Sequence, residues 1–168
     1  ADLTQKMLRK EVDGMIVVPC DGSEDTIRML DERNIPLVLL DRYVPDVKTD
    51  YVSLNNYKAS YEATVHLIRQ GYNRIGFIGY GANLTNMKGR IEGYSKAMAD
   101  HGSKDSIIIK QVEMGSLDKS CEKAMNSLIE NKVDAILFAT NTITIKCLYY
   151  IQNKGIRIPD DLGIVCFD

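Results

Sequence analysis

Short apolar runs alternate with helix-patterned segments along the whole chain, and this alternation restricts the fold more than any other feature of the sequence. The apolar runs, which we predict to be strands, cover residues 14–18, 37–40, 51–54, 74–78, 107–112, 133–139 and 163–167. Helical spacing of apolar residues predicts helices at 1–10, 24–33, 56–70, 87–100, 118–130 and 144–154. Strands that are apolar at nearly every position, with helices between them, are typical of parallel sheets covered on both faces. The sequence therefore predicts an α/β fold.

A glycine after the third helical segment divides this pattern into two similar parts. Gly71 ends the helix predicted at 56–70, and the alternation of strands and helices then begins again. We expect two Rossmann-like lobes with parallel sheets flanked by helices, residues 1–70 and 71–168. The chain opens inside a helix and stops on a strand-end aspartate, and three strands make a thin first sheet. We therefore expect both lobes to be incomplete, with segments missing at both ends.

Composition and charge narrow the possible partners. The 168 residues include 45% hydrophobic and 26% charged side chains, as in soluble globular proteins, and the net charge of −2 attracts neither DNA nor anionic membranes. No apolar stretch is as long as a membrane span, and the opening DLTQKMLRKEVD is unlike a signal peptide. A cytoplasmic protein is the expectation. Four cysteines occur without C-x-x-C spacing, and Cys20 and Cys166, in or beside apolar runs, are predicted to be small buried hydrophobic residues.

Polar residues follow several of the predicted strands. In open α/β sheets, ligands bind beyond the carboxyl ends of the strands. The residues at those positions are Asp41–Arg42, Asn55–Asn56, 79–86, Asn141 and Asp168, and Arg90 lies one turn into the helix after the glycine-containing turn. Asp and Asn side chains can each engage two neighbouring hydroxyls, and arginine adds a forked donor, a combination suited to a polyhydroxylated ligand.

Each of these residues also has a purely structural interpretation. Asn55, Asn56 and Asn141 are equally typical of helix caps and turns. Asp41 and Arg42 can form a surface ion pair of little energetic value, and an arginine on an amphipathic helix is more often solvated than functional. The functional interpretation depends on these residues gathering at one end of the sheets.

Sequence signatures of enzymes are absent. The segment GYGANLTNMKG has neither the dinucleotide-binding glycine spacing nor a phosphate-binding loop, and no G-x-S-x-G elbow occurs. His66 and His101 have no partner at metal-ligand spacing, so a packing or surface role is expected for both. We expect no catalysis, no metal and no cofactor.

Five segments, in matching order and spacing, resemble the LacI/GalR family of bacterial transcriptional regulators. They are VDGMIVVP, IPLVLLDR, YVSLNNYKASYEATVHLIRQGYNRIGFIG, GRIEGYSKAM and VDAILFATNTITIKCLYYIQNKGIRIPDDLGIVCFD. The resemblance implies a two-lobed effector-sensing domain with the fold of type I periplasmic binding proteins, the fold of the periplasmic sugar-binding proteins. In the family, this domain is preceded by a helix-turn-helix DNA-binding headpiece. It also implies a cytoplasmic repressor that is a homodimer. DNA contact is expected only through the headpiece, which is absent from this sequence.

The same resemblance assigns ligand-binding roles to six residues. Asp41 matches the family's strand-end aspartate, Arg90 in RIEGY the arginine that holds the effector, and Asn141 the strand-end asparagine. Asp168 matches the aspartate of the family's G-[FY]-D turn, and Leu54 and Asn86 match positions that line the pocket. The sequence departs from the family at Thr142, Tyr72 and Cys166, where the family has Asp, His and Gly. Thr142 removes an acidic group near the expected pocket.

These observations predict an effector sensor that closes on a small polar metabolite, with a sugar as the expected ligand. Asp41 would come from one lobe, and Arg90, Asn141 and Asp168 from the other, so that the ligand favours one lobe arrangement. The helix after Asn141, with Lys146 and Tyr149–Tyr150, is expected to form part of the dimer seam. Two alternatives remain: a solute-binding receptor of the same fold, and a small α/β enzyme that uses Asp41 or Asp168 as a base.

Overall fold

The protein was analysed as a computed structural model, which describes residues 2–81, 84–101 and 107–167. The chain folds into two compact units, each of which has its own parallel sheet. Unit 1 comprises residues 1–55 and 82–86, and unit 2 comprises residues 56–81 and 87–168. The parallel sheets flanked by helices, predicted from the alternation of apolar runs, are confirmed.

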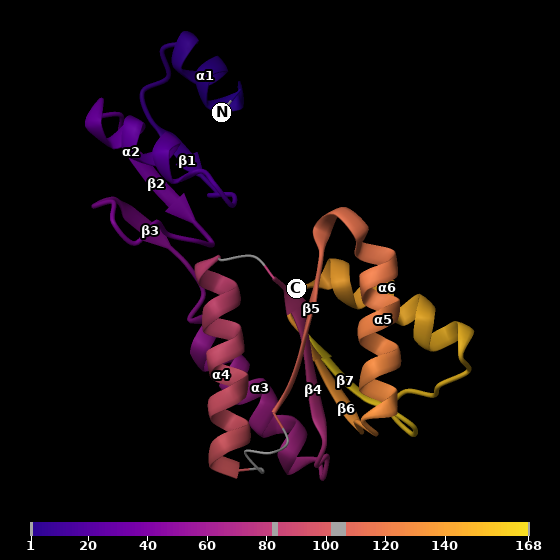
Figure 1. The fold of residues 1–168 in the computed structure, drawn as a ribbon. Coiled ribbons are helices and arrows are strands. Elements are labelled where there is room, and N and C mark those ends of the chain that lie inside the picture. Colours follow the sequence, from indigo (N-terminus) through magenta and orange to yellow (C-terminus); the bar gives the residue numbers. More distant parts are fainter. Residues whose placement is uncertain (1, 82–83, 102–106, 168) are drawn as a thin grey trace. The chain divides into compact units, whose positions relative to one another are not determined.

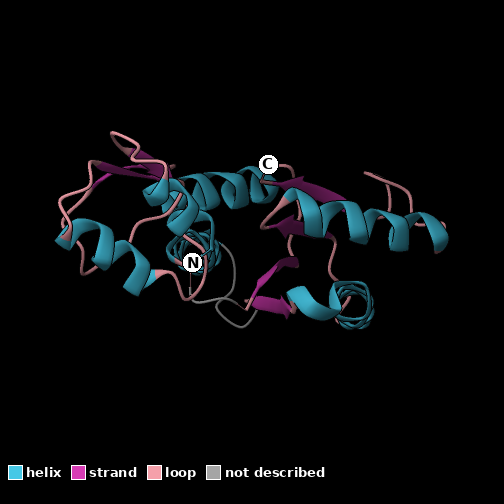
Figure 2. Cartoon of the chain, turned by 90° about the horizontal axis from the view of Figure 1, so that it is seen from above, coloured by secondary structure: helices cyan, strands magenta, loops and turns pink. Residues whose placement is uncertain are grey.

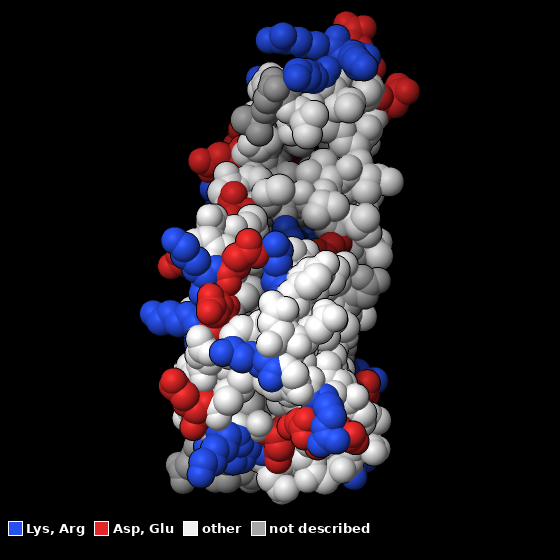
Figure 3. Space-filling view, turned by 90° about the vertical axis from the view of Figure 1, so that its right-hand side faces the viewer, with Lys and Arg blue, Asp and Glu red and all other residues white. Residues whose placement is uncertain are grey.

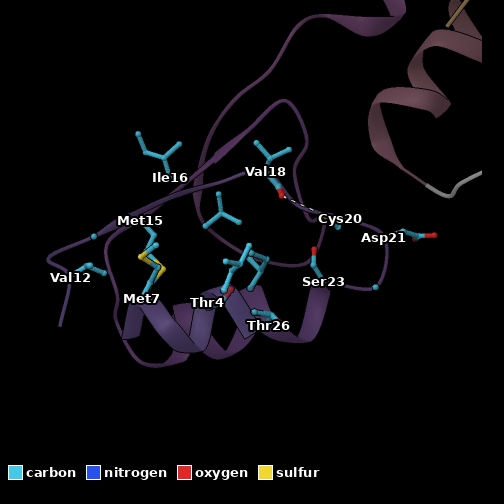
Figure 4. Close-up of a pocket in the computed structure, with 15 residues that line it drawn as sticks. Thr4, Met7, Val12, Met15, Ile16, Val18, Cys20, Asp21, Ser23 and Thr26 are labelled. Atoms are coloured by element: carbon cyan, nitrogen blue, oxygen red, sulfur yellow. Dashed lines mark hydrogen bonds between the residues drawn. The ribbon is translucent and has the colours of Figure 1, made fainter. Parts of the chain in front are cut away.

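Unit 1 has a three-stranded parallel sheet in the order β1-β2-β3 (Figure 1). Its elements are α1 (Asp2–Arg9), β1 (Met15–Val17), α2 (Glu24–Glu32), β2 (Leu37–Leu40) and β3 (Asp50–Val52). Figures 2 and 4 show that α1 and α2 lie on the same side of this sheet. Leu39 is fully buried and packs with Ile27 of α2 and with Val44. One face of the sheet is thus covered by helix, and it carries the core of the unit.

The opposite face of this sheet corrects the prediction that the run at 14–18 is buried on both faces. Ile16, in the middle of β1, is 77% exposed, and Leu40 and Val52 are also exposed. Successive side chains of a strand point to opposite faces, so the helices on one side leave alternate residues uncovered. The apolar run correctly indicated a strand, but its composition did not predict how many faces are covered.

Unit 2 has a four-stranded sheet in the order β5-β4-β6-β7, in which every pairing is parallel. Its strands are β4 (Ile75–Tyr80), β5 (Ile108–Val112), β6 (Ala135–Phe138) and β7 (Gly163–Cys166). Its helices are α3 (Asn56–Arg69), α4 (Thr85–His101, begun in unit 1), the short 3-10 helix η2 (Met114–Ser116), α5 (Leu117–Glu130) and α6 (Asn141–Asn153). Figure 1 shows α3 and α4 on one side of β4, and α5 and α6 on the other.

The two faces of this sheet are buried in alternation. Ile78 and Phe138 belong to the cluster that packs with α5 and α6. Phe77 contacts the ring of Tyr94 on α4, with the ring centroids 5.4 Å apart. The β4 and β6 strands are buried throughout the portions that pair with each other. Here the prediction of strands covered on both faces is correct, because a helix pair packs on each side.

The division between the units differs from the expected boundary at Gly71, because α3 belongs to unit 2. This helix contacts β6 and β7 of the four-stranded sheet, and its buried face includes Ser60, Thr64 and Leu67. The glycine ends the helix, with φ of +96°, but it does not end a compact unit. The glycine that ends α3 therefore did not indicate which of the two sheets this helix packs on.

The cysteine prediction is wrong for the two residues it singled out. Cys20 and Cys166 are exposed, whereas Cys121 and Cys147 are buried in the core between α5 and α6. Cys20 lies in the loop after β1, and Cys166 is the last residue of the edge strand β7. Contact with the Cys121 thiol and burial together raise the pKa of Cys147. Within the described part of the chain, no helix is both long and apolar enough to span a membrane.

Candidate functional site

Asp41 lies directly after β2, at the carboxyl end of the unit 1 sheet. Its backbone has φ of +68°, an unusual value for a residue with a side chain, and its N–H donates to the carbonyl of Val52 at 2.9 Å. Its carboxylate accepts a hydrogen bond from Nδ2 of Asn86, at 3.1 Å. These two hydrogen bonds hold Asp41 in place at the carboxyl end of β2.

The ion pair between Asp41 and Arg42, expected as the purely structural alternative, is also present. Nε of Arg42 lies 3.3 Å from the carboxylate of Asp41, and Nη1 of Arg42 donates to the carbonyl of Pro19 at 2.8 Å. The side chain of Asp41 remains 38% exposed. The ion pair therefore does not bury the carboxylate, which stays accessible to a ligand.

The other two unit 1 candidates differ sharply in burial. Asn86, in the first turn of α4, is 4% exposed and donates to Asp41. Leu54, in the segment between β3 and α3, is 53% exposed. Asn86 therefore connects the start of α4 to the end of β2, whereas Leu54 presents an apolar side chain to solvent.

Arg90 is the most enclosed charged residue that the structure describes, with 6% exposure. Its Nε donates to Oδ1 of Asn56 at 2.7 Å, and its Nη1 donates to the carbonyl of Ala139. Its guanidinium carbon lies 4.2 Å from the centre of the Phe167 ring. Ala139 follows β6 and Phe167 follows β7, so the guanidinium lies at the carboxyl ends of two neighbouring strands, where the sheet topology predicts ligands.

Asn141 is brought to the same end of the unit 2 sheet. It is the first residue of α6, which begins shortly after the end of β6, and it is exposed. Thr140 caps this helix by accepting a hydrogen bond from the N–H of Ile143, so the capping role proposed for Asn141 belongs to its neighbour. The Asn141 side chain accepts a hydrogen bond from the hydroxyl of Thr142, at 3.2 Å. Asp168 lies outside the described residues.

Two contacts of Arg90 were not among the predicted site residues. Asn56 had been noted only as a strand-end residue or cap, and Phe167 only as part of a strand. A signal was present for Asn56, because a buried arginine requires acceptors and the sequence places two asparagines before the helix that packs beside it. Which of the two asparagines accepts the hydrogen bond from Arg90 depends on how α3 packs, and the sequence does not show this packing.

Burying an arginine destabilises the fold unless its N–H donors are hydrogen-bonded. The contacts of a buried arginine therefore indicate which kinds of oxygen the site is built to hold. The guanidinium is planar and permanently charged, and two of its nitrogens are directed onto neutral oxygen acceptors. Such a group favours ligands with paired hydroxyl, carbonyl or anionic oxygens.

A hollow of about 600 Å³ lies elsewhere, beside β1 of unit 1. Figure 4 shows Met7, Met15 and Ile16 around it, with α1 and α2 on one side. Its lining is largely apolar, and none of the six predicted ligand-binding residues takes part.

The described residues include no group of three or more His, Cys, Asp or Glu side chains that could hold a metal ion. Of the two histidines, His66 is exposed on α3, and His101 is exposed at the end of α4, where its Nε2 lies 2.9 Å from the hydroxyl of Tyr61.

Comparison with known proteins shows a family match over nearly the whole chain. Residues 2–165 match the family described as periplasmic binding proteins and sugar binding domain of LacI family. The HTH-type transcriptional repressor PurR of Actinobacillus pleuropneumoniae serotype 3 (strain JL03) is 30% identical over 165 residues, which are 96% of this chain and 48% of the repressor. The chain thus spans about half the length of the curated relatives it matches.

Solved structures show the same architecture. A transcriptional regulator CelR–cellobiose complex has a TM-score of 0.79 and 25% identity, covering 99% of this chain and 52% of that one. A LacI family transcriptional regulator from Enterococcus faecium with bound ribose has a TM-score of 0.84, covering 99% of this chain and 62% of that one. Its identity of 20% supports similarity of fold alone.

Proposed function

Because the chain belongs to the family of periplasmic binding proteins and LacI-type sugar-binding domains, we propose that it senses a small polar effector, with a sugar as the expected ligand. The observation that carries the proposal is the position of Arg90, a buried arginine at the carboxyl ends of β6 and β7. Its planar, forked guanidinium matches a neighbouring pair of ligand oxygens.

The ligand is proposed to engage residues of both units. Asp41 of unit 1 would accept hydrogen bonds from ligand hydroxyls, and Arg90 and Asn141 of unit 2 would donate to its oxygens. Asp168, Asn86 and Leu54 would complete the site. Each charge-assisted hydrogen bond contributes about 1.5–3 kcal/mol. A ligand that binds both units stabilises one arrangement of them, and this difference in affinity is what an allosteric response requires.

Transcriptional control is proposed for the whole protein and not for this chain alone. Its curated relatives include HTH-type repressors, so the effector would alter operator binding by a DNA-binding segment outside this sequence. Figure 3 supports this division, because positive and negative side chains are interspersed on the face it shows. A surface of that kind lacks the single-sign stripe that DNA contact favours. A cytoplasmic location follows from this role.

A homodimer is proposed through the exposed side of α6. Ile145, Leu148 and Tyr149 are 52%, 36% and 62% exposed and lie three and four residues apart, so they share one face of the helix. Lys146, which was also expected in the seam, pairs with Asp118 of the same chain at 2.7 Å. Analytical ultracentrifugation of Tyr149→Glu should show a weaker dimer than wild type. Met114→Glu, at another exposed apolar residue, is the matched control.

The decisive experiment is isothermal titration calorimetry of the full-length protein with ribose, cellobiose, other sugars, nucleobases and amino acids. Arg90→Ala should weaken binding of the compound that binds wild type by roughly tenfold or more, because a charged donor is lost. Arg28→Ala, on a half-exposed arginine paired with Asp25, is the matched control and should leave affinity unchanged. Circular dichroism establishes that each variant is folded. Equal affinity in Arg90→Ala and wild type would remove Arg90 from the site.

Two further measurements on the full-length protein distinguish the proposed sensor from the two alternatives, a solute-binding receptor and a small α/β enzyme. A solute-binding receptor would bind its ligand without any change in operator affinity, which fluorescence anisotropy with labelled operator DNA measures. An enzyme would convert the bound compound, and a product would be detected by NMR. We propose that neither outcome occurs, since the curated relatives are transcriptional regulators.

A further inference from the structure

Asn56 occupies a special place along the chain. It is the first residue of unit 2 after the chain leaves unit 1 at Asn55, and it is also the first residue of α3. Its side chain is 8% exposed, and its Oδ1 accepts the 2.7 Å hydrogen bond from Nε of Arg90. The residue at the crossing between the units is thus bonded directly to the proposed effector-binding guanidinium.

Close packing of α3 against α4 makes this bond possible. A Cβ atom at Gly93 would lie 2.2 Å from the carbonyl oxygen of Tyr57, and one at Gly89 would lie 3.1 Å from Cβ of Asn56. The hydroxyl of Ser60 also donates to the backbone carbonyl of Arg90, at 2.6 Å. Glycine on α4 therefore lets the beginning of α3 approach until the Asn56 side chain reaches the arginine.

Three contacts from three elements restrict the guanidinium. Asn56 receives Nε, the carbonyl of Ala139 receives Nη1, and the ring of Phe167 covers one side of the plane. The acceptor for Nε fixes rotation of the planar group about its last side-chain bonds. Loss of this acceptor would widen the range of orientations of the guanidinium, and fully immobilising one such side chain costs about 0.5–1.5 kcal/mol.

We propose that Asn56 is a positioning residue, which holds Arg90 in the orientation that receives the effector and joins that orientation to the crossing between the units. This inference rests on the proposed function of Arg90. Asn56 contacts no ligand in this scheme. Asn56 begins α3 directly after Asn55. A ligand that shifts the Arg90 guanidinium would therefore also act, through Asn56, on the segment that links the two units.

The first test needs no ligand. In full-length protein with ¹⁵N-labelled arginine, Arg90→Lys identifies the Arg90 Nε–H signal by its loss. Exchange of this proton with water should be roughly tenfold or more faster in Asn56→Ala, because its acceptor is gone. Asn56→Asp should restore slow exchange, since a carboxylate oxygen also accepts. Asn56→Ser, whose hydroxyl is too short to replace Oδ1, provides a second variant that keeps a polar helix start.

Ser60→Ala is the matched control, because it removes a hydrogen bond between α3 and the backbone of the same arginine but leaves the guanidinium contacts in place. Its Arg90 Nε–H should exchange within about twofold of wild type. Unchanged exchange in both Asn56→Ala and Asn56→Ser would overturn the inference. Equal acceleration in Ser60→Ala and Asn56→Ala would also overturn it, since a general loosening of α3 would then explain both.

The second test is affinity, with ribose as the first calorimetric probe. Asn56→Ala should weaken binding roughly three- to tenfold, the cost of ordering one side chain, whereas Ser60→Ala and Asn56→Asp should stay near wild type. In an Arg90→Ala background, Asn56→Ala should have no additional effect, because it acts only through the arginine. If Arg90→Ala itself leaves affinity unchanged, the proposed function fails. If Arg90→Ala weakens binding and Asn56→Ala does not, only the role of Asn56 fails.

Discussion

At the scale of single residues, the structure satisfies buried polar groups with specific partners. Tyr94 is fully buried on α4, and its hydroxyl donates to the carbonyl of Ile75 at 2.7 Å and accepts from the N–H of Ile108 at 3.0 Å. It thus ties a helix to the neighbouring strands β4 and β5. Burial raises the pKa of Tyr94 to about 12, because the charged phenolate is poorly solvated there.

Tyr94→Phe is expected to destabilise the protein by about 1–3 kcal/mol, since it removes the hydrogen bonds to the buried carbonyl of Ile75 and to the part-buried N–H of Ile108. The midpoint of urea unfolding measures this loss, and Tyr149→Phe, at an exposed tyrosine, is the control. A raised folded-state pKa contributes stability that is complete below the ordinary value of 10.0 and declines as pH rises through about 12. Wild type should therefore lose stability more steeply than Tyr94→Phe between those pH values.

Gly93 provides a second test at this scale. Gly93→Ala should cost roughly 1–3 kcal/mol, because its Cβ would overlap the Tyr57 carbonyl and force α3 and α4 apart. Gly115, which has no neighbour within 4 Å of such an atom, is the matched control, and Gly115→Ala should change stability little. Chemical denaturation of the two variants gives the comparison. Equal stability would show that α4 does not require the close approach.

At the scale of elements, the helix starts differ in how they are capped. Thr140 precedes α6, and its hydroxyl accepts a hydrogen bond from the N–H of Ile143. Ser23, a residue type that often caps helices, precedes α2, but its side chain makes no such bond. The residue type alone therefore indicated where the helix begins, and the backbone conformation decided whether the cap forms. At Ser23, φ is −92° and ψ is 0°, which is not the extended conformation typical of a cap.

Thr140→Ala should consequently cost about 1 kcal/mol, the usual value of an N-cap. Ser23→Ala should change the free energy of unfolding by only a few tenths of a kcal/mol, because no capping bond is lost. Urea titrations of both variants test the difference. A larger loss for Ser23→Ala than for Thr140→Ala would contradict the assignment of the caps.

The α5–α6 seam gives a chemical test. Cys121 and Cys147 are buried between these helices, and Cys20 and Cys166 are exposed. Since thiolate formation and access both govern reactivity, iodoacetamide should label Cys20 and Cys166 in the folded protein. It should reach Cys121 and Cys147 only in denaturant. Peptide mass spectrometry identifies the labelled residues, and rapid labelling of Cys147 in the native protein would mean that the seam opens.

At the scale of the whole molecule, the proposed response depends on one ligand that interacts with two units. Each unit has its own sheet, and the chain crosses between them at Asn55–Asn56, before Ala82 and after Asn86. The helix α4 begins in unit 1 with Thr85 and Asn86 and continues in unit 2. Along this one helix, Asn86 bonds to Asp41 and Arg90 lies four residues further on.

Hydrogen exchange with and without the effector tests this directly. At a ligand concentration one hundred times Kd, binding should add about 2.7 kcal/mol to the stability of the protein. Amides near Asp41 and amides near Arg90 and Asn141 should gain protection together. In Arg90→Ala the gain should be reduced in both units. Protection confined to one unit would show that the ligand does not engage both, and the proposed allosteric link would be lost.

Much of this molecule could be read from local patterns. Apolar runs predicted the strands, and helical spacing predicted the helices to within a few residues, because backbone hydrogen bonding and side-chain periodicity are local properties. The strand-end rule and the family resemblance together singled out Asp41, Asn86, Arg90 and Asn141. The strand-end rule depends only on the order of elements in a parallel sheet, which the sequence also indicates.

Long-range packing decided the rest. The sequence did not show that α3 packs on the second sheet, that Ile16 lies on an uncovered face, or that Cys20 and Cys166 are exposed, because each depends on segments distant along the chain. The hydrogen-bond partner of Arg90 also depends on segments distant along the chain. Asn55 and Asn56 are adjacent and chemically identical, and only the close approach of α3 to α4 brings the Asn56 oxygen, within 2.7 Å, to the guanidinium.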